Sequence, residues 1–190
     1  AMVHAIEAFT TKRLKNPVSD CLTKEALRLL AGNLHAAVNA GDNILVRENM
    51  LLGACLAGMA FTNAPVAGVH ALAYPIGAKF HVSHGLSNAL MLGPVMRFNI
   101  AQAHGMYAEL GQTIKPGLQG SSKEQATQLA DYLGGLAGDL GLPKRLAEVG
   151  IAASDIDQLA SDAMLQTRLL QNSPREITLA DANALYREAL

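Results

Sequence analysis

Hydrophobic residues recur along this chain at the three- and four-residue spacing of an amphipathic helix. Residues 19–39 show this spacing most clearly. Ser19 is placed to cap that helix, and Ala40-Gly41 to end it. Its apolar face would carry Leu22, Ala26, Leu29, Leu30 and Leu34. Alternation of valine, isoleucine and threonine is scarce and aromatic residues make up only 4% of the chain, so the pattern disfavours β-structure.

Similar patterns predict helices over most of the remaining chain. The segment 4–10 reads as the tail of a helix that begins upstream. Further helices are predicted from Asp42 or Asn43 to Phe61, then at 65–74, 85–98, 100–112, 121–140, 155–170 and from 178 onward. The predicted caps are Ser121 with Glu124, Ser154, and Thr178 with Asp181.

Prolines and glycines predict where these helices stop. Pro65 fits the first turn of its helix, and Pro75 is expected to kink or end that helix. An irregular connection should then follow over 76–84, and Gly93-Pro94 is a candidate bend. With no internal repeat, the reading is an all-α antiparallel helical bundle forming one domain over 1–190.

One apolar stretch has the composition of a membrane span but is interrupted. Residues 49–78 contain no Asp, Glu, Lys or Arg. A span needs about 20 continuous apolar residues, whereas the polar break at 62–65 limits the run to 50–61. We therefore predict a helix buried in the protein core and no membrane partner. No signal peptide is visible, and we expect a cytoplasmic protein.

Charge and cysteine content narrow the possible partners. The formal net charge is −1 and no segment is rich in Lys or Arg, so nucleic acid is not an expected partner. Cys21 and Cys55 lie in apolar helical contexts without metal or redox spacing. We predict free, buried thiols.

Histidines cluster in the apolar segment 68–89, which contains His70, His81 and His84. An imidazole in an apolar setting needs a hydrogen bond, a charge or a metal ion. His70 shares a helix face with Tyr74, one turn later. A core histidine bonded to a backbone carbonyl is the alternative for His70, and a surface pairing with Glu7 is the alternative for His4.

Four blocks carry a family resemblance. The segment 68–89 has Gly-x-x-His, then Ala-Leu-Ala-x-Pro-x-Gly, then His-Gly with Asn-Ala downstream. The other three blocks are 4–9, 47–63 and Gln171-Asn-Ser-Pro-Arg-Glu176. In this order they resemble the C-terminal, metal-binding half of the iron-containing alcohol dehydrogenases, over nearly the whole chain.

The resemblance implies both a fold and a set of ligands. The fold would be the helical, dehydroquinate synthase-like α domain of these enzymes. Their metal histidines correspond to His4, His70 and His84, and Tyr74 stands where many relatives have a proton-relay histidine. A further aspartate ligand would fall just before Ala1. No Gly-rich dinucleotide motif is present, so we expect the N-terminal nucleotide-binding domain to be absent.

The implied reaction is hydride transfer between NAD(P) and an alcohol, giving an aldehyde or ketone, with a metal acting as Lewis acid. Fe(II) follows from the resemblance, while three histidines would also suit Zn(II). We expect the isolated chain to lack activity and to form a homo-oligomer through an exposed interdomain face. Alternatives are a non-catalytic binding or assembly module, a degenerate remnant, or a metal-dependent hydrolase for which no general base is evident.

The remaining candidates have modest expected roles. His81 is not required as a ligand by the family pattern, and His35 and His104 are expected to be ordinary surface or packing histidines. Lys79 should point toward solvent or a cofactor phosphate. Arg175 should join helices through backbone carbonyls.

Overall fold

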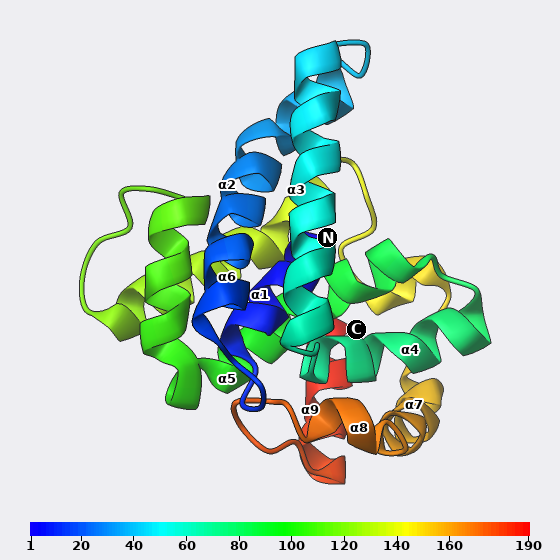
Figure 1. The fold of residues 1–190 in the computed structure, drawn as a ribbon. Helices are drawn as coiled ribbons and strands as arrows, with labels where there is room; N and C mark the ends of the chain where they lie inside the picture. The colour runs from blue at the N-terminus through cyan, green and yellow to red at the C-terminus, as the bar shows by residue number, and fades with distance from the viewer. The chain divides into compact units, whose positions relative to one another are not determined.

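The computed structural model describes residues 1–190 and contains helices without strands (Figure 1). The predicted all-α class is confirmed. The helices in chain order are α1 (Met2–Thr10), α2 (Pro17–Asn39), α3 (Ile44–Asn63), α4 (Gly68–Phe80), α5 (His84–Ile114), α6 (Ser122–Asp139), the 3-10 turns η1 (Leu146–Val149) and η2 (Ala153–Asp155), α7 (Ile156–Met164), α8 (Thr167–Leu170) and α9 (Leu179–Ala189).

Two compact units make up the chain. The first unit comprises Ala1–Val66 with His104–Leu129, and the second comprises Ala67–Ala103 with Ala130–Leu190. Helices α5 and α6 each contribute residues to both units. The expectation of a single domain over 1–190 stays a prediction.

In the first unit, α2 and α3 form an antiparallel pair and α1 packs against both (Figure 1). Small side chains allow close approach at two places. Ala8, Ala60 and Ala64 are fully buried together, with Leu22 and Phe61 packed against them. Farther along α3, a Cβ added to Gly53 would lie 2.8 Å from Leu30 Cγ on α2. The α2–α3 contact therefore depends on the absence of side-chain volume.

The prediction that the apolar segment beginning at 49 forms a buried core helix is wrong for α3. Only 22% of the most apolar window of this helix is buried, so α3 is not a core helix. The helix is also long and apolar enough to cross a membrane. Length and composition alone are weak evidence of a membrane span, since core helices of other proteins share them. Burial is confined to the side carrying Val46, Gly53, Ala57 and Ala60. The larger apolar side chains lie on the opposite side.

Both cysteines are free, as predicted, but the prediction that they are buried is wrong. Cys21 and Cys55 are exposed. Cys55 lies on the uncovered side of α3, and apolar neighbours in sequence did not ensure that another element covers it.

Local cap signals are mostly confirmed. Asn43 caps α3, Ser121 and Glu124 hydrogen-bond reciprocally at the start of α6, and Thr178 and Asp181 form the capping box of α9. Ser19 is not the cap of α2. Asn16 caps this helix by accepting from the Ser19 N–H at 2.9 Å, because Pro17 already fits the first helical position.

In the second unit, α4 packs against α7 and α8, and α7 packs against α9. The expected stop at Pro75 does not occur, since α4 begins at Gly68 rather than Pro65 and continues through Pro75 to Phe80. The buried Tyr186 hydroxyl of α9 donates to Leu72 O at 2.6 Å, within the turn that precedes Pro75. This outside donor stabilises the turn where proline interrupts the helix's own bonding.

Helix α5 also passes through a proline. The predicted helices at 85–98 and 100–112 are one 31-residue helix containing Pro94. Residues 90–96 are all buried, and packing at that depth offsets the cost of an internal proline. A Cβ added to Gly93 would lie only 3.0 Å from Gly134 Cα on α6. The two backbones therefore meet at their glycines.

The last third of the chain departs from one prediction. The helix expected at 155–170 is divided into α7 and α8, and Ser154 does not cap it. Arg175 has the predicted structural role. Its Nη1 donates to Phe98 O at 3.2 Å, and its guanidinium stacks 3.8 Å from the Phe98 ring centroid.

Candidate metal centre

Helix α4 places His70 and Tyr74 one turn apart, on the same side of the helix. The His70 side chain is 1% exposed, whereas Tyr74 is 42% exposed. Their ring centroids lie 6.2 Å apart with nearly perpendicular planes. The helix thus carries one imidazole in the protein interior and one phenol at the surface.

His84, the first residue of α5, brings a third ring to this place. Its centroid lies 5.3 Å from that of His70 and 6.1 Å from that of Tyr74. The three residues 81–83 make the reversal between the helices, and His81 adopts φ 55°, which is the left-handed conformation that ends α4. The predicted irregular connection is therefore much shorter than 76–84.

Asn88 lies one turn beyond His84 on α5. Its Nδ2 donates to His84 O at 2.9 Å and lies 3.3 Å from His84 Nε2. Its Oδ1 is buried without a hydrogen-bond partner. Desolvation, followed by the neighbouring His70 imidazole, lowers the pKa of His84 although part of its surface is exposed. Both effects favour the neutral imidazole over the charged form.

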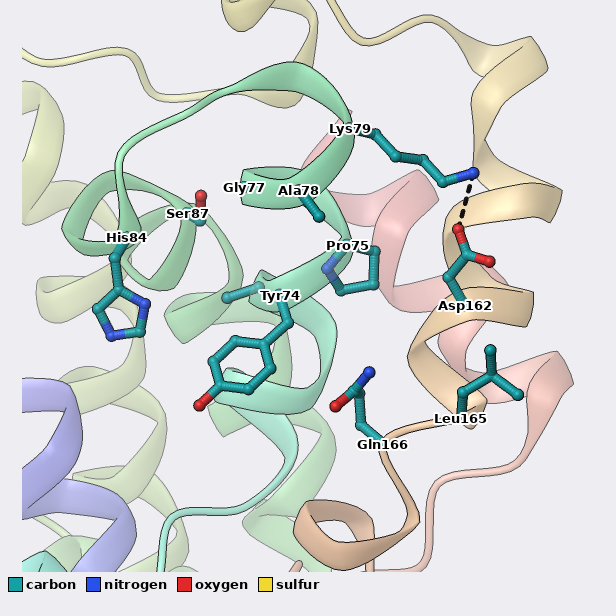
Figure 2. A pocket seen from close by; sticks show the side chains of 11 residues that line it. Tyr74, Pro75, Gly77, Ala78, Lys79, His84, Ser87, Asp162, Leu165 and Gln166 are labelled. Atoms are coloured by element: carbon teal, nitrogen blue, oxygen red, sulfur yellow. Dashed lines mark ion pairs between the residues drawn. The ribbon is translucent and has the colours of Figure 1, made fainter.

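A cavity of about 510 Å³ opens beside these rings (Figure 2). Figure 2 shows His84 and Tyr74 on one side of it and Lys79 reaching across to Asp162. The Lys79 Nζ–Asp162 Oδ2 distance is 2.8 Å. The residues that line it are Ala73, Tyr74, Pro75, Gly77, Ala78, Lys79, His84, Ser87, Asp162, Leu165 and Gln166.

Lys79 was predicted to point toward solvent or a cofactor phosphate. Its side chain is 42% exposed, and its ammonium is paired with Asp162 on α7, a partner that the sequence did not predict. Its hydrogen bond to the carboxylate is the main cause that lowers the pKa of Asp162. The pair joins α4 to α7 at the edge of the cavity.

His4 belongs to the first unit, on α1. It is half-buried, and its ring centroid lies 4.7 Å from that of Phe61 on α3. The structure therefore groups His70, His84 and Tyr74 within the second unit, and the participation of His4 stays a prediction.

The other histidines have ordinary surroundings. His35 and His81 are exposed, and His104 Nδ1 lies 2.9 Å from Ser122 Oγ. These positions agree with the predicted surface or packing roles of His35 and His104.

A model described as "Fe-containing alcohol dehydrogenase family, C-terminal" matches residues 1–190. The chain belongs to this family.

Relatives extend the match. The chain is 38% identical over 190 residues to Long-chain-alcohol dehydrogenase 1 of Geobacillus thermodenitrificans, covering 100% of this chain and 48% of that protein. It is 34% identical over 190 residues to 1,3-propanediol dehydrogenase of Citrobacter freundii, covering 100% of this chain and 49% of that protein. The chain therefore spans about half the length of these relatives.

The fold matches as well. The crystal structure of a 1,3-propanediol oxidoreductase superposes with a TM-score of 0.94 at 33% identity, covering 100% of this chain and 49% of that one. The predicted likeness to the helical C-terminal domain of the iron-containing alcohol dehydrogenases is thus confirmed.

The sequence reasoning gave no role to two site residues, although one of them, Asn88, belongs to the Asn-Ala pair of the motif. Asn88 stands four residues after His84, so helix spacing alone places both on one face, and this was the available signal. Asp162 gave no comparable signal, because it reaches Lys79 only through the packing of α7 on α4.

Proposed function

We propose that this chain is the metal-binding half of an NAD(P)-dependent iron-type alcohol dehydrogenase that interconverts alcohols with aldehydes or ketones. The observation that carries the proposal is the His70–His84 pair, 5.3 Å apart between ring centroids, beside a cavity in a chain of this family. His4, His70 and His84 would be the protein's metal ligands within the chain.

The donor chemistry fits a divalent cation. His84 has a lowered pKa, and neutral imidazole is the form that binds metal ions. The buried Asn88 Oδ1 has no hydrogen-bond partner. Asn88 Nδ2 donates to His84 O at 2.9 Å, so this amide fixes the turn of α5 that presents the His84 ring. The environment of His84 thus supports a ligand role.

A bound cation would supply Lewis-acid polarisation of the substrate oxygen. The residues of the chain would hold and enclose the substrate. The cavity is large enough for a small alcohol, and Leu165 with Gln166 forms its wall opposite Tyr74 (Figure 2). The Tyr74 hydroxyl would hold or pass the alcohol proton, since a phenol can both donate and accept a hydrogen bond.

Iron is the first candidate for the metal because the family is described as Fe-containing. Zinc is the second candidate. Three imidazoles with one open position are a common catalytic zinc set, whereas additional open positions suit six-coordinate Fe(II).

The relatives are about twice as long as this chain, and the nicotinamide cofactor would bind to the half of such an enzyme with which this chain does not align. We therefore propose that residues 1–190 alone lack turnover, that a cytoplasmic setting supplies NAD(P), and that the protein self-associates through an interdomain face.

Calorimetric titration with Fe(II) under anaerobic conditions, and separately with Zn(II), tests the metal proposal. We expect the unmodified chain to bind one ion, and His70→Ala and His84→Ala to lose binding. His4→Ala should weaken binding, and Asn88→Ala should weaken it about 10-fold through loss of the hydrogen bond that positions His84. His35→Ala is the matched control and should bind normally.

Unchanged binding in both His70→Ala and His84→Ala would contradict the proposed centre. Failure of the unmodified chain to bind either metal would favour the non-catalytic module instead. Turnover assays with NADH and simple aldehydes complete the test, and robust activity of the isolated chain would refute the expected need for a second half.

A further inference from the structure

The second unit contains another cavity, which shares no lining residue with the cavity beside His84. Its volume is about 350 Å³, at the small end of the usual range for ligand pockets. Helices α5, α6 and α9 and the loop after α6 form its walls. Its charged lining, four basic and two acidic side chains, consists of Arg97, Lys144, Arg145, Arg187, Asp131 and Glu188. This basic cavity therefore has an excess of two positive side-chain charges, although the chain has a formal net charge of −1.

Arg97 is oriented by both acidic side chains of the basic cavity. Its Nε donates to Glu188 Oε1 on α9 at 2.6 Å, and its Nη1 donates to Asp131 Oδ1 on α6 at 3.2 Å. The guanidinium lies beside the meeting point of Gly93 and Gly134, where no side chain takes up the space. The planar guanidinium group is thus fixed on two sides, and its Nη2 stays available to a ligand.

Lys144 and Arg145 supply charges that no acid of the chain neutralises. Neither the Lys144 ammonium nor the Arg145 guanidinium has a hydrogen-bond or ion-pair partner. The carbon stem of Lys144 lies against the α6 backbone at Gly138, where an added Cβ would be 2.7 Å from Lys144 Cδ and 2.8 Å from Cγ. Packing of this stem, and not a carboxylate, therefore holds the ammonium at the basic cavity.

Helix ends account for only part of this positive charge. Cations are favourable near the C-terminal end of a helix, and this effect suits Arg187 in the last turn of α9 and Lys144 after the end of α6. Arg97 lies within α5, and Arg145 stands at the N-terminal end of η1, where the same effect disfavours a cation. The convergence of all four cations on one cavity therefore points to an anionic ligand.

We propose that the basic cavity binds a phosphate monoester, a small organic molecule that carries one phosphate group. A phosphate monoester has a charge of about −1.5 to −2 at pH 7 and three strong acceptor oxygens. This charge balances the excess of two basic side chains, whereas a carboxylate supplies one charge and two oxygens. Arg97, Lys144 and Arg145 would donate charge-assisted hydrogen bonds to the phosphate.

The remaining lining suits a small ester better than a polymer. The apolar residues Leu90, Pro94 and Ala189 also line the basic cavity and would contact the carbon skeleton of the ester. The Asp131 side chain is 62% exposed and that of Glu188 is 42% exposed. These carboxylates would repel a polyanion, such as nucleic acid, that extended beyond the cavity.

Calorimetric titration of the 190-residue chain with phenyl phosphate tests the proposal. EDTA is present throughout, so that no metal ion at the histidines can bind the phosphate and the result is independent of the proposed metal centre. We expect saturable binding of one phenyl phosphate, weaker binding of inorganic phosphate, and no binding of benzoate or phenol. Lys144→Gln and Arg145→Gln should each weaken binding about 10-fold or more, because each removes a hydrogen bond to a charged group. Lys123→Gln and Arg168→Gln, which change exposed basic residues outside the cavity, are the matched controls.

Gly138→Ala distinguishes a formed site from a positive surface in general. Its added Cβ displaces the Lys144 stem but keeps every charge of the chain. We expect phenyl phosphate to bind several-fold more weakly, because the ammonium loses its fixed position. Gly105→Ala is the control, since no atom lies within 4 Å of its added Cβ, and it should bind normally.

Four results would overturn the proposal. They are the absence of saturable phenyl phosphate binding, binding that is unchanged in both Lys144→Gln and Arg145→Gln, benzoate binding as tight as that of phenyl phosphate, and equal binding by Gly138→Ala and Gly105→Ala. Tighter binding of inorganic phosphate than of phenyl phosphate would overturn the assignment to a monoester and identify free phosphate as the ligand.

Discussion

The α2–α3 pair and the surroundings of α4 are held together in different ways. Between α2 and α3 the contact is made by small residues, with Gly53 against Leu30 and Ala26, and Asn49 Nδ2 donates to Asn33 Oδ1 at 3.3 Å across it. Around α4 a buried hydroxyl reaches a backbone carbonyl, from Tyr186 to Leu72. The α2–α3 contact depends on close approach of the two helix backbones, whereas the contact at α4 depends on a specific hydrogen bond.

The difference shows which substitutions each region tolerates. The stability of a close helix–helix contact is sensitive to added side-chain volume and nearly independent of pH. A buried bond to a carbonyl is sensitive to loss of one hydroxyl and to ionisation of that group. His70 lies on α4 two residues before Leu72 and is buried, with its side chain 1% exposed.

Gly53→Val should produce the largest effect. Even a Cβ at this position lies 3.2 Å from Ala26 O, a backbone atom that cannot rotate away. We expect a loss of about 1–3 kcal/mol in the free energy of unfolding, measured by denaturant titration. Gly32→Ala is the control, because no atom lies within 4 Å of its added Cβ, and it should gain about 0.5–1 kcal/mol. Equal stability of the two variants would show that the α2–α3 contact does not require close packing at Gly53.

Tyr186→Phe should produce the next effect. It removes the donor to Leu72 O while keeping the ring, and leaves a buried carbonyl without that partner. We expect a loss of about 1–3 kcal/mol by thermal unfolding. Thr62→Val removes a comparable side-chain bond to Gly58 O in an exposed place, where water replaces the donor, and should cost far less. A larger loss of stability in Thr62→Val than in Tyr186→Phe would show that burial does not decide the contribution of these hydrogen bonds.

The buried Tyr186 hydroxyl should also make the stability of the protein depend on pH in the alkaline range. Burial raises the pKa of Tyr186 above its ordinary value, so the folded state keeps the proton that the unfolded chain releases near pH 10. The contribution is complete below about pH 10 and is lost as pH rises further. Denaturant titrations at increasing pH should show this decline, and Tyr186→Phe should reduce it. An unchanged slope in the variant would assign the decline to other groups.

Lys79→Met should have the smallest effect. The Lys79–Asp162 pair is partly exposed, and such pairs contribute about 0–1 kcal/mol. Because Lys79 lowers the pKa of Asp162, that contribution is present above the ordinary aspartate value of about 3.9 and is lost as pH falls through the lower folded value. Unfolding at pH 7 and at pH 2 measures it, with Lys123→Met as the control. A large loss at neutral pH would mean that the pair organises the cavity.

Local signals predicted the features that depend on neighbouring residues. The caps at Asn43 and Thr178 require only a side chain and the next turn, and the shared side of His70 and Tyr74 requires only helix spacing. The continuation of α4 through Pro75 was not predictable in this way, since the hydroxyl that anchors the preceding turn at Leu72 O belongs to Tyr186 on the last helix.

The candidate site follows the same division. The residue types of His70 and His84 were identified from the sequence, but their 5.3 Å separation depends on the tight reversal at His81. The partly exposed α3 shows a second limit of prediction from sequence. Hydrophobic composition counts apolar side chains without revealing which side another element covers.

The meeting of Gly93 and Gly134 has a consequence for sequence variation. The nearest atom to an added Cβ at each position is the Cα of the other glycine, and the Arg97 guanidinium lies beside both, so tolerance there is governed first by size. A saturation library at Gly93 would therefore sort mainly by volume, with alanine and serine already at the steric threshold.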